Sequence, residues 1–392
     1  MIDSATSPNQ TSQNQPHRPR VLVSDDQHDI LTALSLLLKI NNFRTQTVDS
    51  PAEALEAAKD GKFDLVLMDL NYSRDTTSGQ EGLDLLSGLR RSGVNAPIVV
   101  MTAWGNVELA VEAMRLGAAD FVQKPWDNHR LLSTLRKQLD RAEEELRERQ
   151  RKRSELEIAR HVQQKLLPQD LKPLRTLEYA AICIPAREVG GDYYDFFYLG
   201  DEHFAGLLAD VSGKGVAAAM LMANLQACFR SQFDLGLRET ATLLETVNRL
   251  FHASTPAEQY VTLFFFEYDD YTRKLRYVNC GHVAPVLIRT SGDVLRLDST
   301  NTVIGLFPTC CAEVQELALE ANDVLVLFTD GATEFQDKHG EEFGDGRFVD
   351  LATSARRLNP KAAVDHVAQH LQSQAGPGEQ FDDQTIVILR GR

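Results

Sequence analysis

The sequence has no long apolar segment and no excess of basic residues. No hydrophobic run approaches the roughly 20 residues that a membrane-spanning helix needs, and residues 1–18 lack the apolar core of a secretory signal. The formal net charge is −15, whereas nucleic-acid binding needs a concentrated basic face. We therefore predict a cytoplasmic protein that uses neither a membrane nor a nucleic acid as its partner. Residues 1–18, rich in Ser, Gln, Asn and Pro, are predicted to form a disordered tail.

Several catalytic motifs are also missing. The five cysteines form no CxxC pair, so we expect reduced thiols, and none has an arginine six residues later, as a cysteine-dependent phosphatase requires. No HExxH zinc-protease motif occurs. Ser212 lies in SGKG, which fits neither a GxSxG elbow nor a phosphate-binding P-loop. The chemistry must therefore depend on other groups.

The first half alternates short apolar strands with helical patterns. Four such strands are expected at residues 20–24, 64–69, 96–102 and 120–125. Continuous apolar strands between helices predict a parallel, doubly wound α/β sheet. We expect this domain over residues 19–138.

Polar residues stand at the ends of these strands. Asp25, Asp26 and Asp69 would converge at one edge of the sheet, where three carboxylates repel each other unless they bind a hard cation such as Mg²⁺. Thr102 and Lys124 end the next two strands. A carboxylate nucleophile beside a cation, a hydroxyl and a lysine is equipped to accept a phosphoryl group.

This pattern resembles the receiver domain of two-component response regulators. The resemblance implies that Asp69 is the phosphoacceptor, that Asp25 and Asp26 are metal ligands, and that the backbone carbonyl of Asn71 completes the metal site. It further implies that Thr102 is the switch hydroxyl, Lys124 the phosphate-binding lysine and Phe121 the switch aromatic. It also implies Mg²⁺ and a cognate histidine kinase. Residues 71–82 depart from the family, because this loop is long and lacks the usual Met-Pro.

A long charged helix is predicted from Leu131 to Leu167. Leucines at 132, 135, 139 and 146 follow the spacing of a coiled-coil seam, which favours a homodimer. Arg149 and Arg153 occupy the next two seam positions and weaken the seam. The alternative is a solvated single helix between two domains. We expect this linker over residues 139–170.

The second half, residues 171–392, has apolar strands, two helical stretches (216–230 and 239–251) and tight turns, which indicates an α+β fold. Acids stand at strand ends or turns on four separate segments, namely Asp192, Asp210, Asp330 and Asp382, with Asp383 as the register alternative to Asp382. Each alone could be a turn residue. Together they predict an oxygen-ligand site for Mg²⁺ or Mn²⁺, of the type that often holds two ions and activates a water for attack on phosphorus.

In this order, the four segments resemble the PPM (PP2C-like) metal phosphatases, and most closely their bacterial sporulation and stress-regulator branch. The match runs from Ile158 to the C-terminus. The resemblance implies an αββα sandwich, two Mn²⁺ or Mg²⁺ ions bridged by Asp210, a carbonyl ligand from Val211, and further ligands from Asp192, Asp330 and Asp382. It also implies a phosphoserine or phosphothreonine protein substrate, usually an anti-sigma-factor antagonist.

Three basic or imidazole side chains near these acids keep open roles. His282 is expected to be structural, while Lys214 and Arg187 could contact a substrate phosphate or be solvated surface charges. The whole pattern predicts a receiver that controls a metal-dependent protein serine/threonine phosphatase. The alternative is a catalytically inactive phosphatase-like scaffold that binds a partner under receiver control.

Overall fold

The computed structural model describes residues 18–72, 79–102, 107–169, 171–200, 202–237, 239–376, 380 and 382–392. The predicted disordered tail lies almost entirely outside these residues. The chain divides into two compact units, Met1–Lys152 and Arg153–Arg392. Among the residues described, no helix is both long enough and apolar enough to cross a membrane.

The first unit is built around a five-stranded sheet with the order β2-β1-β3-β4-β5. Its strands are β1 (Arg20–Ser24), β2 (Arg44–Val48), β3 (Leu65–Asp69), β4 (Ile98–Thr102) and β5 (Asp120–Gln123). Its helices are α1 (His28–Ile40), α2 (Pro51–Asp60), α3 (Gln80–Arg91), α4 (Val107–Arg115) and the first part of α5 (Asn128–Leu166). All the strand pairs are parallel, which confirms the predicted doubly wound α/β fold.

Both faces of this sheet are covered, since β3 and β4 are buried at every position and are apolar except for their last residues, Asp69 and Thr102. One core packs against α2, α3 and α4, and the other packs against α1 and α5. Helix α2 begins where Ser50 accepts a hydrogen bond from the backbone of Glu53 and Pro51 starts the first turn. The strand β2 was not predicted, since its sequence RTQTV is too polar for an apolar-run criterion.

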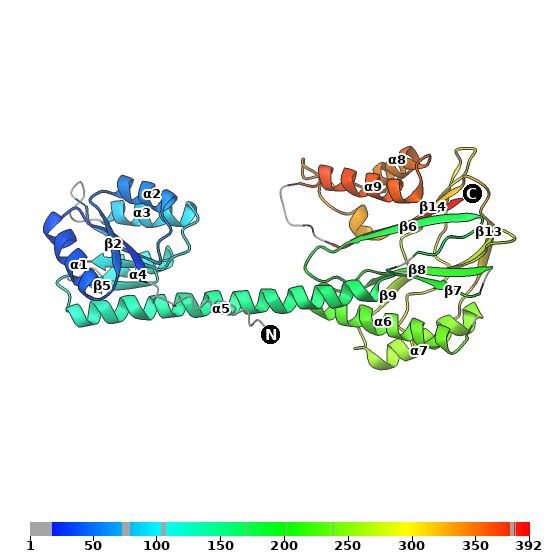
Figure 1. Cartoon of the computed structure of the whole chain (residues 1–392), viewed down its shortest axis with the longest axis horizontal. Helices are drawn as coiled ribbons and strands as arrows, with labels where there is room; N and C mark the ends of the chain where they lie inside the picture. Colours follow the sequence, from blue (N-terminus) through cyan, green and yellow to red (C-terminus); the bar gives the residue numbers. More distant parts are fainter. Residues whose placement is uncertain are drawn as a thin grey trace, which may run out of the picture. The chain divides into compact units, whose positions relative to one another are not determined.

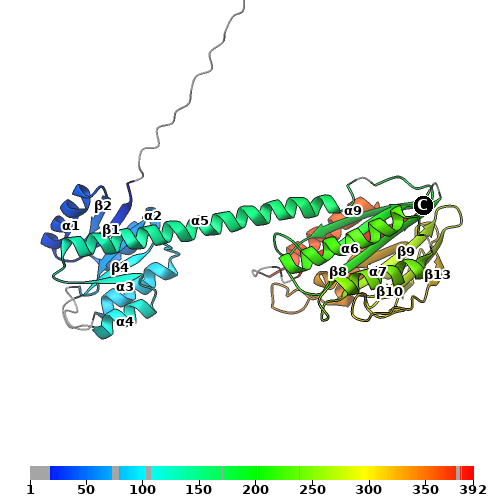
Figure 2. The same ribbon diagram turned by 90° about the horizontal axis from the view of Figure 1, so that it is seen from below.

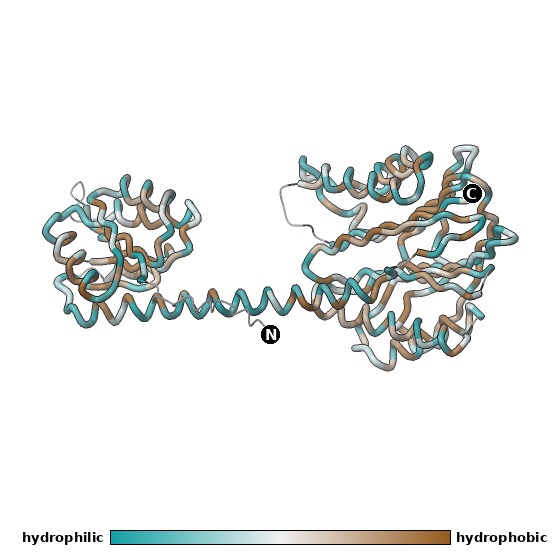
Figure 3. The backbone as a smooth tube through the Cα atoms, in the orientation of Figure 1, coloured by the Kyte–Doolittle hydropathy of each residue, from teal (hydrophilic) through white to brown (hydrophobic). Residues whose placement is uncertain are grey.

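Helix α5 differs along its length. Leu131 and Leu135 are buried in the core of the first unit, so Leu135 does not belong to a free coiled-coil seam. Further on, the helix is mostly hydrophilic (Figure 3), and its exposed apolar side chains are Leu146, Ile158 and Val162. The predicted seam is thus partly used inside the first unit, because an amphipathic stripe that packs on a domain has the same spacing as a coiled-coil seam.

The second unit contains two five-stranded antiparallel sheets, β13-β10-β9-β8-β7 and β12-β11-β14-β15-β6. The strands are β6 (Leu177–Ile184), β7 (Tyr193–Tyr198), β8 (His203–Val211), β9 (Val261–Asp269), β10 (Lys274–Cys280), β11 (Val286–Ile288), β12 (Val294–Arg296), β13 (Gln315–Ala318), β14 (Val324–Phe328) and β15 (Gln384–Gly391). The helices are α6 (Val216–Asp234), α7 (Thr240–Ser254), the short 3₁₀ helix η1 (Asp330–Ala332), α8 (Asp345–Ala355) and α9 (Pro360–Gln374).

These elements form an αββα sandwich, as predicted. Helices α6 and α7 cover the first sheet, and α8 and α9 cover the second (Figures 1 and 2). A third core, which includes Leu208, Phe264, Leu327 and Leu389, fills the space between the two sheets. The sequence interpretation identified only α6 and α7 as helical stretches and missed α8 and α9. The start of α9 carried a readable signal, since Asn359 caps the helix and Pro360 opens it.

Candidate functional site

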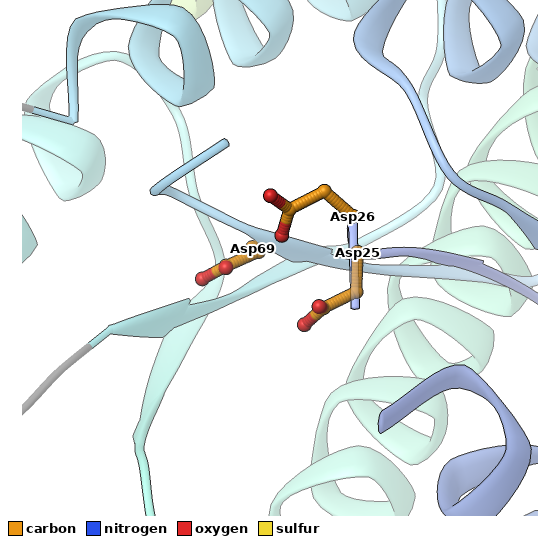
Figure 4. A group of neighbouring side chains, drawn as sticks. All are labelled: Asp25, Asp26 and Asp69. Carbon is orange, nitrogen blue, oxygen red and sulfur yellow. The ribbon is translucent and has the colours of Figure 1, made fainter. Parts of the chain in front are cut away.

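The first acidic site lies at the carboxyl edge of the parallel sheet. Asp25 follows β1, Asp69 ends β3, and these strands are direct neighbours. One carboxylate oxygen from each of Asp25, Asp26 and Asp69 lies within 4.8 Å of the others. Figure 4 shows the three side chains close to one another at the strand ends. This is the edge at which open α/β sheets bind ligands.

Lys124 lies between two of these acids. Its Nζ is 2.6 Å from Oδ2 of Asp25 and 2.9 Å from Oδ2 of Asp69, and its side chain is only 16% exposed. Burial raises the pKa of Asp69, and the charge of Lys124 opposes that rise. The lysine therefore offsets part of the repulsion between the carboxylates.

The remaining predicted receiver residues occupy neighbouring positions. Thr102 is buried at the end of β4, directly after the register partner of Asp69. Phe121 on β5 is exposed. Within the part of the chain that is described, the buried side-chain oxygens Asp26 Oδ1 and Asn71 Oδ1 have no hydrogen-bond partner. Three carboxylates and unsatisfied oxygens fit a hard cation such as Mg²⁺, which would be held by Asp25, Asp26 and Asp69.

Tyr72 is a residue of this site that sequence reasoning missed. It is buried, and its hydroxyl lies 2.8 Å from Oγ of Ser24 at the end of β1. This bond ties the segment that follows Asp69 to the neighbouring strand. The only available signal was an aromatic residue where the receiver pattern usually has Met-Pro.

The second acidic site draws on both sheets of the second unit. Asp192 directly precedes β7 and Asp210 lies near the end of β8, whereas Asp330 follows β14 and Asp382 precedes β15. Both strand pairs are antiparallel, so the start of one strand and the end of its partner share an edge. The topology therefore brings the segments together in pairs, and contacts between the two sheets, such as that of Thr329 with Asp192, join the two pairs.

Asp192 is the most enclosed of these acids. Its Oδ2 accepts hydrogen bonds from the hydroxyls of Thr329 (2.8 Å) and Thr385 (2.6 Å). Burial raises its pKa well above the usual value, and the charge of Asp210 adds to the rise. Sequence reasoning missed both threonines, although each lies within three residues of a predicted acid.

Asp210 and Asp330 are half-buried and face other carboxylates. Burial, together with the charges of Asp330, Asp382 and Asp383, raises the pKa of Asp210 to about 8, while the charge of Lys214 acts to lower it. The pKa of Asp330 is also raised, by burial and then by Asp382. Because these carboxylates repel each other, we expect the site to require bound cations when all of the acids are ionised.

Asp382 and Asp383 have different environments. Asp382 is 37% exposed, and its Oδ2 lies 2.8 Å from Nζ of Lys214. Asp383 is buried, and it accepts hydrogen bonds from the backbone N–H groups of Ala186 (2.8 Å) and Gly191 (2.6 Å). Asp382 thus pairs with Lys214, while Asp383 binds the glycine loop, and the charge of Asp383 also acts on Asp192 and Asp210.

The glycine loop at Gly190 and Gly191 has no room for side chains. A Cβ at Gly190 would lie 2.1 Å from Oδ2 of Asp383, and one at Gly191 would lie 3.0 Å from the carbonyl oxygen of Val211. The carbonyl group of Val211, which is a predicted metal ligand, therefore borders this loop. Oxygen donors from Asp192, Asp210, Asp330 and Asp382 are the set that Mn²⁺ or Mg²⁺ takes, so the residues present fit these ions.

His282 and Arg187, two further polar residues near these acids, have different environments. His282 is buried, and its Nδ1 lies 2.9 Å from Oγ1 of Thr262, whose register partner is Asp210. Burial lowers the pKa of His282 to about 4, so the ring is neutral at pH 7. Arg187 lies beside the SGKG loop, since its Nη1 is 3.6 Å from where a Cβ of Gly215 would stand.

Comparisons with known proteins agree with both halves. Residues 21–136 match the response regulator receiver domain, and residues 200–392 match the family of stage II sporulation protein E (SpoIIE). Protein IcfG of Synechocystis is 30% identical over 268 residues, which cover 60% of this chain and 41% of that protein. Phosphoserine phosphatase RsbU of Bacillus subtilis is 30% identical over 190 residues, covering 48% of this chain and 56% of RsbU.

A solved structure supports the fold of the second half. The PP2C domain of SiaA from Pseudomonas aeruginosa is similar with a TM-score of 0.55 at 22% identity, and the match covers 62% of this chain and 97% of that domain. The chain spans about half the length of each of these two curated relatives. These similarities confirm the predicted pair of domain types.

Proposed function

The chain joins a response regulator receiver domain to a SpoIIE-type domain with a PP2C-like fold, and we propose that it is a metal-dependent protein phosphatase under receiver control. One observation carries this proposal. Asp210 shares its surroundings with acids from two other segments, and together with burial they raise its pKa to about 8. A half-buried group of mutually repelling carboxylates is suited to hold divalent cations.

In this function, Asp210 would bridge two ions, Val211 would add its carbonyl, and Asp192, Asp330 and Asp382 would complete the ligand set. Bound Mn²⁺ or Mg²⁺ would supply charge stabilisation at the phosphoryl oxygens and an activated water. Thr329 and Thr385 orient Asp192 through their hydroxyl hydrogen bonds, and Asp383 holds the loop at Gly191. Such positioning keeps the ligands in place before the substrate arrives.

We propose that the receiver is phosphorylated on Asp69 by a histidine kinase, with Mg²⁺ held by Asp25, Asp26 and the carbonyl of Asn71. Lys124 would neutralise the phosphoryl oxygens, and Thr102 with Phe121 would respond to the new charge. The residue limits of the receiver (19–138), linker (139–170) and phosphatase (171–392) belong to the same proposal. The cytoplasmic location stays a prediction from the sequence.

The proposed substrate is a phosphoserine or phosphothreonine protein, with an anti-sigma-factor antagonist as the first candidate. Support comes from the similarity to RsbU, whose name describes a phosphoserine phosphatase. We further propose a homodimer that pairs through α5. Leu146, which is exposed on the predicted seam, supports this pairing.

Hydrolysis of an aryl phosphate by the full chain, with and without Mn²⁺, tests the enzymatic function. Turnover that depends on Mn²⁺ supports the phosphatase, and its complete absence in a folded protein favours the inactive scaffold. The second step offers phosphorylated antagonist proteins as substrates, with and without acetyl phosphate to load the receiver. Release of phosphate from one of them would identify the substrate class.

A further inference from the structure

Lys214 is presented to the acids of the second unit by a loop with an unusual backbone. Gly213 and Gly215 flank it, and both have positive φ angles of 98° and 72°, which side-chain-bearing residues rarely adopt. The start of the loop is held firmly. Ser212 exchanges backbone and side-chain hydrogen bonds with Tyr260, and its hydroxyl donates to Gln259 at 3.0 Å.

The ammonium group of Lys214 lies within the acidic site. Its Nζ is 2.8 Å from Oδ2 of Asp382, and the lysine side chain is 48% exposed. The charge also acts on acids beyond this partner, because it lowers the pKa values of Asp210 and Asp330. Lys214 is therefore a cation that already interacts with three of the four proposed ligands.

We propose that Lys214 is a built-in counter-cation of the phosphatase site and competes with a divalent metal ion for Asp382. The inference rests on the proposed function and adds a determinant of metal affinity to it. A metal ion bound to Asp382 would lie next to the ammonium group, and two cations on one carboxylate repel each other. The flanking glycines allow the lysine to turn away when the ion binds.

The competition costs little to overcome because the pair is exposed. Ion pairs in contact with water contribute little to stability, so the lysine would weaken metal binding without preventing it. Such a residue would set the concentration at which the site fills. It would also leave the carboxylates partly neutralised when no ion is bound.

The test is calorimetric titration of the full chain with Mn²⁺ in the absence of substrate. Lys214→Met should raise the Mn²⁺ affinity of the phosphatase site about fivefold, the size expected when an exposed ion pair is lost. Lys214→Arg should leave the affinity near that of the parent, because the charge is retained. Lys274→Met is the matched control, since Lys274 forms a pair of the same 2.8 Å length with Glu316 elsewhere in the unit.

A double-mutant cycle separates competition at Asp382 from a general effect of charge. Lys214→Met should not change Mn²⁺ affinity in an Asp382→Asn background. An equal gain in both backgrounds, or no gain in either, would overturn the proposal. The Asp210→Asn variant defines binding at the receiver alone, so a parent that binds no more Mn²⁺ than this variant would instead overturn the proposed function.

Discussion

The receiver and the phosphatase unit both gather carboxylates at strand ends, but they balance the negative charge differently. In the receiver, one nearly buried lysine, Lys124, contacts both Asp25 and Asp69. In the phosphatase unit, acids from four segments meet a lysine that is half exposed and contacts one of them, Asp382. The pKa of Asp210 rises to about 8 in this setting.

This difference follows from what each site has to do. In the proposed function the receiver accepts a phosphoryl group on Asp69, so a fixed cation beside Asp69 would serve both the resting and the phosphorylated state. A site that holds two metal ions needs carboxylates that are not already paired. The phosphatase unit should therefore depend on added metal more strongly than the receiver does.

The largest expected effect concerns the receiver acid itself. Acetyl phosphate should add one phosphoryl group to the parent chain, and Asp69→Asn should accept none because the amide is not a nucleophile. Intact-mass spectrometry measures the label, and Asp84→Asn, an exposed residue on α3, is the matched control. Stoichiometric label on the Asp69→Asn protein would show that another residue is the phosphoacceptor.

The next largest effect is expected on phosphatase turnover, when Asp210 in the second site is replaced. Asp210→Asn should lower Mn²⁺-dependent turnover about a hundredfold or more, because bound metal supplies several kcal/mol of transition-state stabilisation. Circular dichroism should be unchanged, and Asp365→Asn on α9 should retain full activity. Near-normal turnover by a folded Asp210→Asn protein would remove the bridging role from this residue.

A smaller effect should arise from the connection between the two units. We predict that receiver phosphorylation raises phosphatase activity through α5, by ~5–150-fold for a coupling free energy of ~1–3 kcal/mol. One residue inserted near Gln150 rotates the following helix by ~100° and should abolish this response.

A seven-residue insertion at the same place is the control, because it returns the helix to within about 20° of its original face. It should keep most of the response to acetyl phosphate. If the one-residue and seven-residue insertions respond as strongly as the parent, α5 is only a tether and the two sites are not coupled through it.

The smallest effect separates the two neighbouring acids Asp382 and Asp383. Asp383→Ala leaves the backbone N–H groups of Ala186 and Gly191 without their acceptor, so it should destabilise the second unit by about 1–3 kcal/mol. Asp382→Ala should leave metal-free stability nearly unchanged, because that side chain is partly exposed. Urea unfolding of both variants in EDTA makes the comparison, and equal losses would contradict the assigned difference.

Much of the fold could be predicted because its signals are local. The apolar strands that end in Asp25, Asp69 and Asp210 are visible as short runs followed by an acid. Helices α8 and α9 were missed because the broad pattern of the second half is dominated by strands. The coiled-coil seam was predicted too generously, since spacing alone cannot tell whether Leu135 packs on a second chain or on its own domain.

The sequence by itself determined the two domain types and the positions of the acids proposed for both sites, because strand ends and turn residues are set by neighbours in the chain. Only the tertiary structure decided how those acids are partnered. Asp383 is captured by backbone groups almost two hundred positions away, and its neighbour Asp382 meets Lys214 from another loop. Thr329 and Thr385 reach Asp192 in the same way. Such contacts depend on how two sheets pack, and no pattern within one segment records that packing.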